Sequence, residues 1–268
     1  MGISKRLDEA RKAYRNGDQK AGAHAHDPKV IAQMTAEPHG GAGSQYIGEM
    51  VYGGLDGIVT TFAVVSGVAG AELGANIVLI LGLANLFADG FSMATGAYLS
   101  AKSEKEYYDR EQTRERWEVE HYPEGEAAEL YELYVNRGYT EEDARHLIEI
   151  QTRTVDRWVD TMMIDELNMH RDERNPLVNA LATLGSFIVA GAVPLLVYLL
   201  GLIMPIAPQT SFFVSLGLSG LALFGLGAAK VFITERNPIK GGLEMLFVGG
   251  LAAGVAYLVG ALLKGIGA

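Results

Sequence analysis

Five long apolar runs place the strongest limit on how this chain can fold. Each run contains at most one charged residue, and each approaches or exceeds the ~20 residues that a helix needs to cross the hydrocarbon core of a membrane. The runs span residues 50–71, 76–101, 177–203, 211–229 and 243–263. The sequence therefore predicts an all-α integral membrane protein with five transmembrane helices.

A long acidic segment, residues 102–175, separates the second run from the third. It holds 21 acidic and 11 basic residues, and its balance of −10 equals the formal charge of the whole chain. Pro123 stops a first helix, Gly138 is a suitable C-cap, and Thr140 with Asp143 resembles a capping box. We expect a small helical domain whose first and last helices continue the second and third transmembrane helices.

The chain is thus expected to have four parts. A polar basic tail covers residues 1–45, two transmembrane helices 46–101, the acidic domain 102–175 and three further transmembrane helices 176–268. The tail, the acidic domain and the connection 230–240 hold 7, 11 and 3 basic residues, whereas the other two connections hold none. Because basic loops remain on the cytoplasmic side, we expect the tail and the acidic domain to be cytoplasmic.

The basic tail offers weaker signals. It has no apolar core of signal-peptide length, so no cleaved secretory signal is expected. Its first 16 residues have apolar side chains at helical spacing, which predicts a short basic helix on a membrane surface. Three histidines follow in a linker, where weak metal binding and an unstructured tether both remain open. They are His24, His26 and His39.

Carboxylates of the acidic domain recur at helical spacing. Glu104, Glu111, Glu115 and Glu118 are 7, 4 and 3 residues apart and share one face of a helix. Met162, Glu166, Met169 and Glu173 form a second stripe, with spacings of 4, 3 and 4. Two such helices face to face would offer oxygen and sulfur ligands to a divalent metal such as Fe(II), and no cysteine is available to contribute. The alternative is a solvated charged face.

Two acidic residues, Asp56 and Asp89, lie inside the first two apolar runs. A carboxylate in hydrocarbon costs about 2.5–3.5 kcal/mol on insertion scales, so an intramembrane acid is a candidate functional residue. Asp89 shares a helix face with Asn85 and Met93, which together form a plausible ion path. The alternatives are that Asp56 caps its helix and that Asp89 is a protonated structural acid.

Glycines are frequent in two of the predicted helices. We expect them to permit close helix packing. They are Gly53, Gly54, Gly57, Gly67, Gly70 and Gly74 in and after the first helix, and Gly217, Gly220, Gly225 and Gly227 in the fourth.

Four short motifs, in this order along the chain, resemble the vacuolar iron transporter family. They are D-G-I-V-T at 56–60, F-S-M-A-T-G at 91–96, V-D-T-M-M-I-D-E-L at 159–167 and G-G-L-E-M-L at 241–246. The similarity extends over about residues 46–263. It implies a dimer of five-helix subunits that moves Fe(II), and often Mn(II), out of the cytosol in exchange for protons.

The resemblance also implies roles for particular residues. Asp56 and Met93 would lie on the translocation path, and the cytoplasmic domain would bind metal. The implied metal ligands are Glu104, Glu115, Glu118, Met162 and Glu166, with Glu111 and Met163 nearby. Tyr107 and Ala97 stand where members of the family carry glutamate, and we hypothesise that Asp89 supplies the charge missing at Ala97.

These observations predict a transporter rather than an enzyme. A carboxylate that binds a divalent cation must release its proton, so metal and protons compete for the same groups and antiport can result. The expected partners are metal ions, protons, the lipid bilayer and a second copy of the chain; neither nucleic acid nor a prosthetic group is expected. The membrane would be the cell membrane of a prokaryote or the vacuolar membrane of a eukaryote.

Two other functions remain open at this stage. One is a membrane-anchored di-iron carboxylate oxidase, because Glu118 and His121 have the Glu-x-x-His spacing of such sites. The other is a membrane-bound metal sensor without transport. Acids within the apolar runs argue against a sensor, because a simple anchor does not need them.

Overall fold

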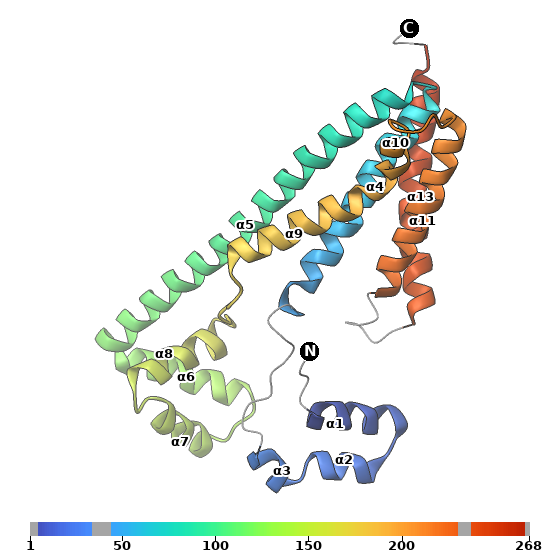
Figure 1. The fold of residues 1–268 in the computed structure, drawn as a ribbon. Helices are drawn as coiled ribbons and strands as arrows, with labels where there is room; N and C mark the ends of the chain where they lie inside the picture. The colour runs from blue at the N-terminus through green and yellow to red at the C-terminus, as the bar shows by residue number, and fades with distance from the viewer. Residues whose placement is uncertain (1–4, 34–43, 230–236, 266–268) are drawn as a thin grey trace. The chain divides into compact units, whose positions relative to one another are not determined.

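The computed structural model describes residues 5–33, 44–229 and 237–265. Within these ranges the regular structure is helical, and no strand is present (Figure 1). The chain forms two compact units. The first contains residues 1–93 and 181–268, and the second contains residues 94–180.

Among the residues that the structure describes, five helical stretches are long and apolar enough to cross a membrane, as the sequence predicted. They are α4 (Ile47–Gly70), α5 (Ala75–His121), α9 (Pro176–Gly191) continued by α10 (Leu196–Leu200), α11 (Pro208–Ala229) and α13 (Pro238–Leu263). The 47 residues of α5 correspond to about 70 Å at a rise of 1.5 Å per residue. Since a hydrocarbon core is about 30 Å thick, only part of α5 can lie within it.

The sequence predicted one unbroken helix for the third apolar run. The structure instead divides the run into α9 and α10. Pro194 lies in a short 3₁₀ turn, η3 (Val193–Leu195), between α9 and α10. Proline has no N–H to donate and its ring disfavours a continuous helix, so the break occurs there. The Pro194 carbonyl instead accepts a buried hydrogen bond from the Ser215 hydroxyl of α11, at 2.7 Å.

Glycines bring the membrane helices into backbone contact. A Cβ added at Gly70 of α4 would lie 2.2 Å from the Tyr257 carbonyl oxygen of α13, and one at Gly260 would lie 2.0 Å from the Gly67 oxygen. Gly227 of α11 and Gly241 of α13 meet in the same way. The predicted packing role is therefore confirmed for some glycines, but a Cβ added at Gly74, Gly217 or Gly225 would meet no other element within 4 Å.

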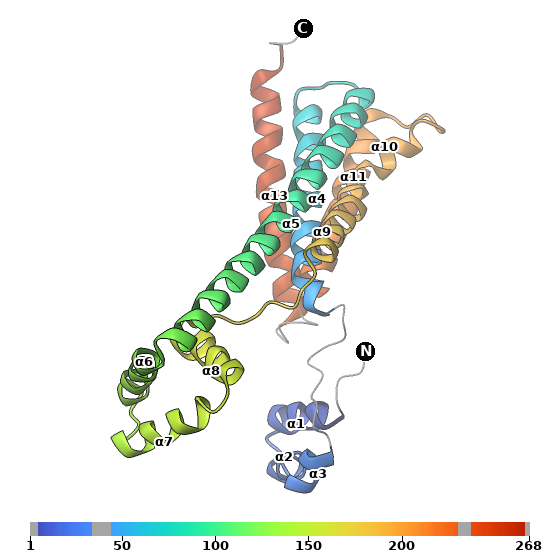
Figure 2. The same cartoon turned by 90° about the vertical axis from the view of Figure 1, so that its left-hand side faces the viewer.

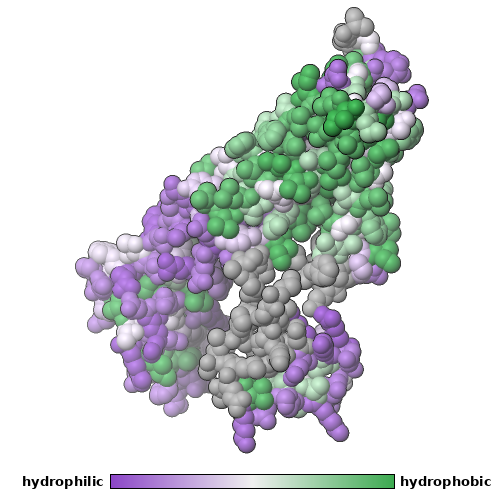
Figure 3. All heavy atoms as spheres, viewed as in Figure 1, coloured by the Kyte–Doolittle hydropathy of each residue, from purple (hydrophilic) through white to green (hydrophobic). Residues whose placement is uncertain are grey.

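Large apolar side chains cover the outside of the first unit. Val189, Leu221 and Leu262 are 74%, 73% and 80% exposed, and they belong to three different membrane helices. Figure 3 shows hydrophobic residues gathered over these helices. Such an extended apolar surface is unfavourable in water and favourable in lipid, so the unit is that of a multi-pass membrane protein.

The second unit packs short helices against the last turns of α5 (Figure 2). They are α6 (Pro123–Asn136), α7 (Glu141–Gln151), α8 (Val155–Thr161) and the π-helical turn η2 (Met162–Glu166). The predicted boundaries at Pro123, Gly138 and Thr140 are confirmed: Gly138 has φ +94°, and the Thr140 hydroxyl accepts the Asp143 N–H at 3.2 Å. Leu130, Tyr134 and Val159 are buried in the core of this unit.

The last helix of this unit is shorter than predicted. It ends at Glu166, so Met169 and Glu173 are not on a helix with Met162, and no helix runs unbroken into α9. Asn168 has φ +52°, a left-handed conformation that asparagine tolerates and that ends a helix. Pro176 disfavours helix at the residue before it.

The tail contains more helix than expected. A helix in the first 16 residues is confirmed as α1 (Lys5–Asn16), and α2 (Gln19–Ala25) and α3 (Pro28–Gln33) follow it, with a short 3₁₀ turn, η1 (Ser44–Tyr46), before α4. His24 therefore lies in a helix rather than a flexible linker, 3.7 Å from the Glu9 carboxylate. His39 and most of the connection 230–240 lie outside the described residues.

The backbone contact at Gly260 generates a direct prediction. Gly260→Ala should lower the thermal unfolding midpoint of the detergent-purified protein, because overpacking of this kind costs about 1–3 kcal/mol. Gly254→Ala, on the same helix with nothing within 4 Å, is the matched control and should leave the midpoint unchanged or raise it. Equal midpoints for the two variants would show that α4 and α13 do not meet at Gly260.

Candidate metal centre

Three glutamates from different elements of the second unit converge on one point. One carboxylate oxygen from each of Glu115, Glu126 and Glu166 lies within 4.8 Å of the others. Glu115 and Glu126 are buried, 1% and 6% exposed, whereas Glu166 is exposed. Three converging carboxylates can supply the oxygen ligands of one divalent cation.

Local structure places each of these side chains. Glu115 lies on α5, and Glu126 lies in the first turn of α6, three residues after Pro123. Glu126 occupies the buried face of α6 together with Leu130 and Tyr134, at spacings of four residues. Glu166 is the last residue of the π-helical turn η2, a type of turn that is frequent at functional sites.

The carboxylates are held in a state that resists ionisation. Burial, reinforced by Glu115 and Glu129, raises the pKa of Glu126 to about 7. Although Glu166 as a residue is exposed, partial desolvation of its carboxyl group raises its pKa to about 7, with contributions from Glu129 and Glu115 and a carboxyl–carboxyl hydrogen bond to Glu129. Burial also raises the pKa of Glu115. Binding a proton or a metal cation removes the electrostatic cost of ionising these buried, neighbouring carboxylates.

A buried oxygen without a partner tests whether the cluster fits a metal ion. The Oε2 atom of Glu126 is buried and makes no hydrogen bond. An orphaned buried oxygen of this kind costs free energy unless a cation or a proton satisfies it. The donor set therefore fits a divalent cation, with Glu115, Glu126 and Glu166 as ligands.

Glu111 and Glu118 flank this point but bind an arginine. Arg114 donates to Glu111 at 3.0 Å and to Glu115 and Glu118 at 2.5 Å. Hydrogen bonds from Arg110 and Arg114 hold the pKa of Glu111 below its ordinary value. Three of the four glutamates of the predicted stripe, Glu111, Glu115 and Glu118, are thus bound to one guanidinium group.

The other predicted ligands of the second unit are placed differently. Glu104 is exposed and accepts a hydrogen bond from Ser100 at 3.1 Å, a full two turns before Glu111. Met162 and Met163 are completely buried in the core beside Val159. A surface hollow of about 480 Å³ lies beside Glu166, and its lining also includes Glu129 and Glu132.

The residues that the sequence predicted to lie on an ion path belong to the first unit, where α4, α5 and α9 meet. Asp56 is in the interior of α4, far from its start at Ile47, so it does not cap the helix. Asp89 is in the interior of α5. The glycine after each of them, Gly57 and Gly90, packs on Phe187 of α9. This shared contact holds the two acid-bearing segments together.

Asn85 and Met93 flank Asp89 on α5. The side-chain nitrogen of Asn85 is buried without a hydrogen-bond partner, and Met93 is partly buried against the apolar core of the unit. An unsatisfied N–H donor next to an acid is consistent with an ordered water there, whereas a cation would be bound by the amide oxygen of Asn85.

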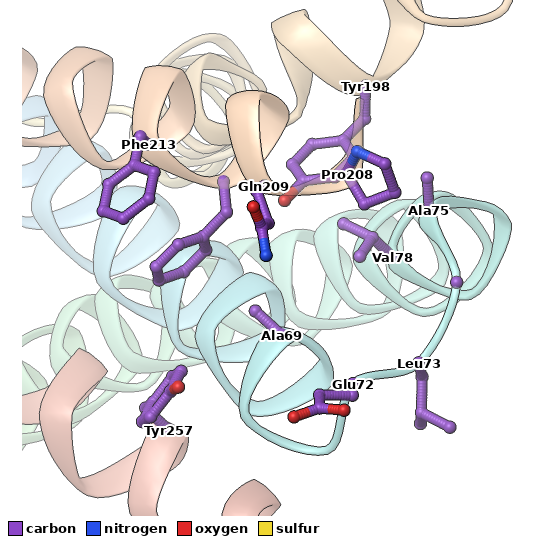
Figure 4. A pocket seen from close by; sticks show the side chains of 12 residues that line it. Ala69, Glu72, Leu73, Ala75, Val78, Tyr198, Pro208, Gln209, Phe213 and Tyr257 are labelled. Atoms are coloured by element: carbon purple, nitrogen blue, oxygen red, sulfur yellow. The ribbon is translucent and has the colours of Figure 1, made fainter. Parts of the chain in front are cut away.

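A separate cavity of about 470 Å³ lies at one end of the first unit (Figure 4). The α4–α5 turn, α10, the start of α11 and Tyr257 line it, and Glu72, which is paired with Lys264 at 2.5 Å, contributes a carboxylate. Asp56, Asn85, Asp89 and Met93 are not among its lining residues.

The structure adds Glu126 and Glu129 to the residues that the sequence identified. The sequence did contain a signal: Glu126 stands four residues before Leu130 and eight before Tyr134, so an acid occupies an apolar helix face. The oxidase pair is not assembled, since Glu118 binds Arg114 and the exposed His121 ring stacks on Trp117 at 4.6 Å.

Comparison of the sequence with known proteins identifies the family of the chain. A family model described as the VIT family matches residues 47–261. A Toxoplasma gondii protein named vacuolar iron transporter is 36% identical over 267 residues, covering 96% of this chain and 88% of the relative. A Plasmodium falciparum protein of the same name is 34% identical over 268 residues, covering 98% of each. Vacuolar iron transporter 1 of Arabidopsis thaliana is 31% identical over 232 residues, covering 86% of this chain and 91% of the relative.

The orphaned oxygen of Glu126 predicts the effect of removing its charge. Glu126→Gln should weaken binding of Mn(II), used as a probe, by about tenfold or more, because one anionic ligand is lost. The same change removes repulsion from Glu115, so the metal-free protein should keep or raise its unfolding midpoint. Glu124→Gln, an equal charge change at an exposed position of α6, is the control. Unaltered Mn(II) affinity in Glu126→Gln would remove Glu126 from the site.

The raised pKa values of Glu126 and Glu166 predict a pH dependence. Below pH 7 both groups hold protons that the metal must displace, so Mn(II) affinity should fall by about ten- to a hundredfold from pH 7 to pH 6. The folded state also holds protons that the unfolded state, with an ordinary glutamate pKa of 4.5, releases. The metal-free protein should therefore gain stability as pH falls from about 7 toward 4.5, and Glu126→Gln should flatten that gain. A pH-independent Mn(II) titration would contradict this assignment.

Proposed function

The chain belongs to the VIT family, and on that premise we propose that it carries Fe(II), and also Mn(II), out of the cytosol across a membrane in exchange for protons. It is a multi-pass membrane transporter and not an enzyme. The observation that carries the proposal is the pair of acids, Asp56 and Asp89, on two membrane helices whose adjacent glycines, Gly57 and Gly90, both pack on Phe187.

Two carboxylates in one membrane interior need a compensating cation. Repulsion between them and the low dielectric both disfavour two negative charges, so the pair binds protons or a divalent ion. In the proposed cycle a metal ion displaces protons from Asp56 and Asp89 on the cytosolic side. The ion is then released on the far side as protons return. Competition for the same oxygens couples the two movements.

The glutamate cluster of the second unit would collect the metal. Glu115, Glu126 and Glu166 bind one ion, and the hollow beside Glu129 and Glu132 admits it from solvent. Placement of this unit and the tail in the cytoplasm, and dimerisation, belong to the proposal. A vacuolar membrane fits the names of the relatives, and a prokaryotic chain would occupy the cell membrane.

Flux into proteoliposomes tests the proposal. With an imposed pH gradient and an internal pH dye, Fe(II) entry should be accompanied by proton exit, and Asp56→Asn should reduce both to background. Glu141→Gln, an exposed acid of α7 paired with Arg145, is the control and should transport normally. Metal binding without flux under any gradient would refute transport and favour a membrane-bound metal sensor.

Asp89→Asn separates the two acids in the same assay. If Asp89 supplies the charge missing at Ala97, Fe(II) flux should persist weakly or not at all, and the coupled proton exit should disappear. Intact coupling in Asp89→Asn, together with loss in Asp56→Asn, would assign the coupling to Asp56 alone.

A further inference from the structure

The guanidinium group of Arg114 occupies the centre of the carboxylate stripe on α5. Its Nε atom donates to Glu111 Oε2 at 3.0 Å, one terminal nitrogen donates to Glu118 Oε2 at 2.5 Å, and the other donates to Glu115 Oε1 at 2.5 Å. Each guanidinium nitrogen thus serves a different carboxylate. The three acceptors stand three residues before, one after and four after Arg114.

This arrangement differs from an ordinary surface ion pair. An exposed pair contributes about 0–1 kcal/mol and usually joins one anion to one cation. Here the Glu115 side chain is 2% exposed and that of Glu111 is 13% exposed, so two of the three carboxylates that the arginine compensates are largely shielded from water. An arginine remains protonated at every physiological pH, so its charge leaves the cluster only if the side chain moves away.

The cluster therefore has two sides with different occupants. On one side Arg114 joins Glu111, Glu115 and Glu118. On the other, Glu115 converges with Glu126 and Glu166, and the Glu126 Oε2 atom is buried without a partner. Glu115 belongs to both sides, because its carboxylate accepts a hydrogen bond from Arg114 and also lies within 4.8 Å of the carboxylates of Glu126 and Glu166. One side already holds a cation, and the other has an open ligand.

We propose that Arg114 stands in the place of a second metal ion and limits the cluster to the ion bound by Glu115, Glu126 and Glu166. The proposal rests on the proposed function, in which this unit binds the transported metal. Removing the guanidinium would take away the arginine partner that Glu115 and Glu118 share, while Glu111 would keep its hydrogen bonds from Arg110. Carboxylates in that state bind a divalent cation. Arg114 is then a residue that sets the number of ions bound.

Counting bound Mn(II) tests the proposal. The full-length protein in detergent is titrated with Mn(II) at pH 7.5, and free Mn(II) is followed by its electron paramagnetic resonance signal. Arg114→Gln should bind one more Mn(II) per chain than the unaltered protein, and the frozen sample should show spin coupling between neighbouring ions. The matched control is Arg116→Gln, which removes the same charge two residues away. Arg116 is paired with Asp156, and its side chain is 44% exposed, as is that of Arg114.

Further variants separate a metal position from a structural ion pair. Arg114→Lys keeps one positive charge and should retain the original number of ions. If Arg114→Gln is unstable without metal, it is purified in Mn(II) and its metal content is counted after gel filtration. A folded Arg114→Gln protein that holds no more Mn(II) than the unaltered protein would overturn the proposal.

The same titration distinguishes this proposal from the proposed function. If the unaltered protein binds no Mn(II), metal collection by the second unit fails. If it binds Mn(II) and Arg114→Gln adds no ion, only the role of Arg114 fails. Iron flux in proteoliposomes reports on transport independently of both counts.

Discussion

Repulsion between carboxylates that water cannot screen is the constraint on which this structure depends. Two unit charges 4 Å apart interact by about 4 kcal/mol at an effective dielectric constant of 20. The second unit brings Glu115, Glu126 and Glu166 within 4.8 Å of one another, and the first unit holds Asp56 and Asp89 on segments that both pack on Phe187. The three glutamates repel one another unless a cation compensates them. In the proposed site, protons, the Arg114 guanidinium and a divalent metal would compete for these oxygens.

The two units meet this constraint in different ways. In the first unit, helices packed through glycine hold the acids in place, since Gly57 and Gly90 both contact Phe187. Close-packed backbones leave little freedom for the acids to separate. In the second unit, a π-helical turn ends at Glu166, and Pro123 sets the start of the helix that carries Glu126. The helix α5 contributes to both groups, with Asp89 and Glu115 on one continuous element.

The sequence was sufficient for features governed by local chemistry. Hydropathy predicted five membrane helices, and Pro123, Gly138 and Thr140 marked helix ends, because each depends on residues within a few positions. Tertiary contacts were beyond its reach. Spacing groups residues of a single helix, so it linked Glu104 to Glu115 although Glu104 lies outside the cluster. It could not link Glu115 to Glu126, which lies on another helix. Glycine content likewise could not separate Gly70, which meets α13, from Gly217, which meets nothing.

A transport protein must also release what it binds, and this limits how well its ligands can be satisfied. A cluster of carboxylates whose pKa values remained near 4.5 would exchange few protons at neutral pH, so metal binding there would be nearly independent of pH. The pKa values of Glu126 and Glu166, raised to about 7, instead let protons leave and return near neutral pH, where a metal ion bound as proposed would compete with them. Burial produces that shift, so the burial that makes the site costly without a cation also makes its loading reversible. Arg114 acts in the same direction, because a cation already bound to Glu115 weakens the hold of that carboxylate on the next one.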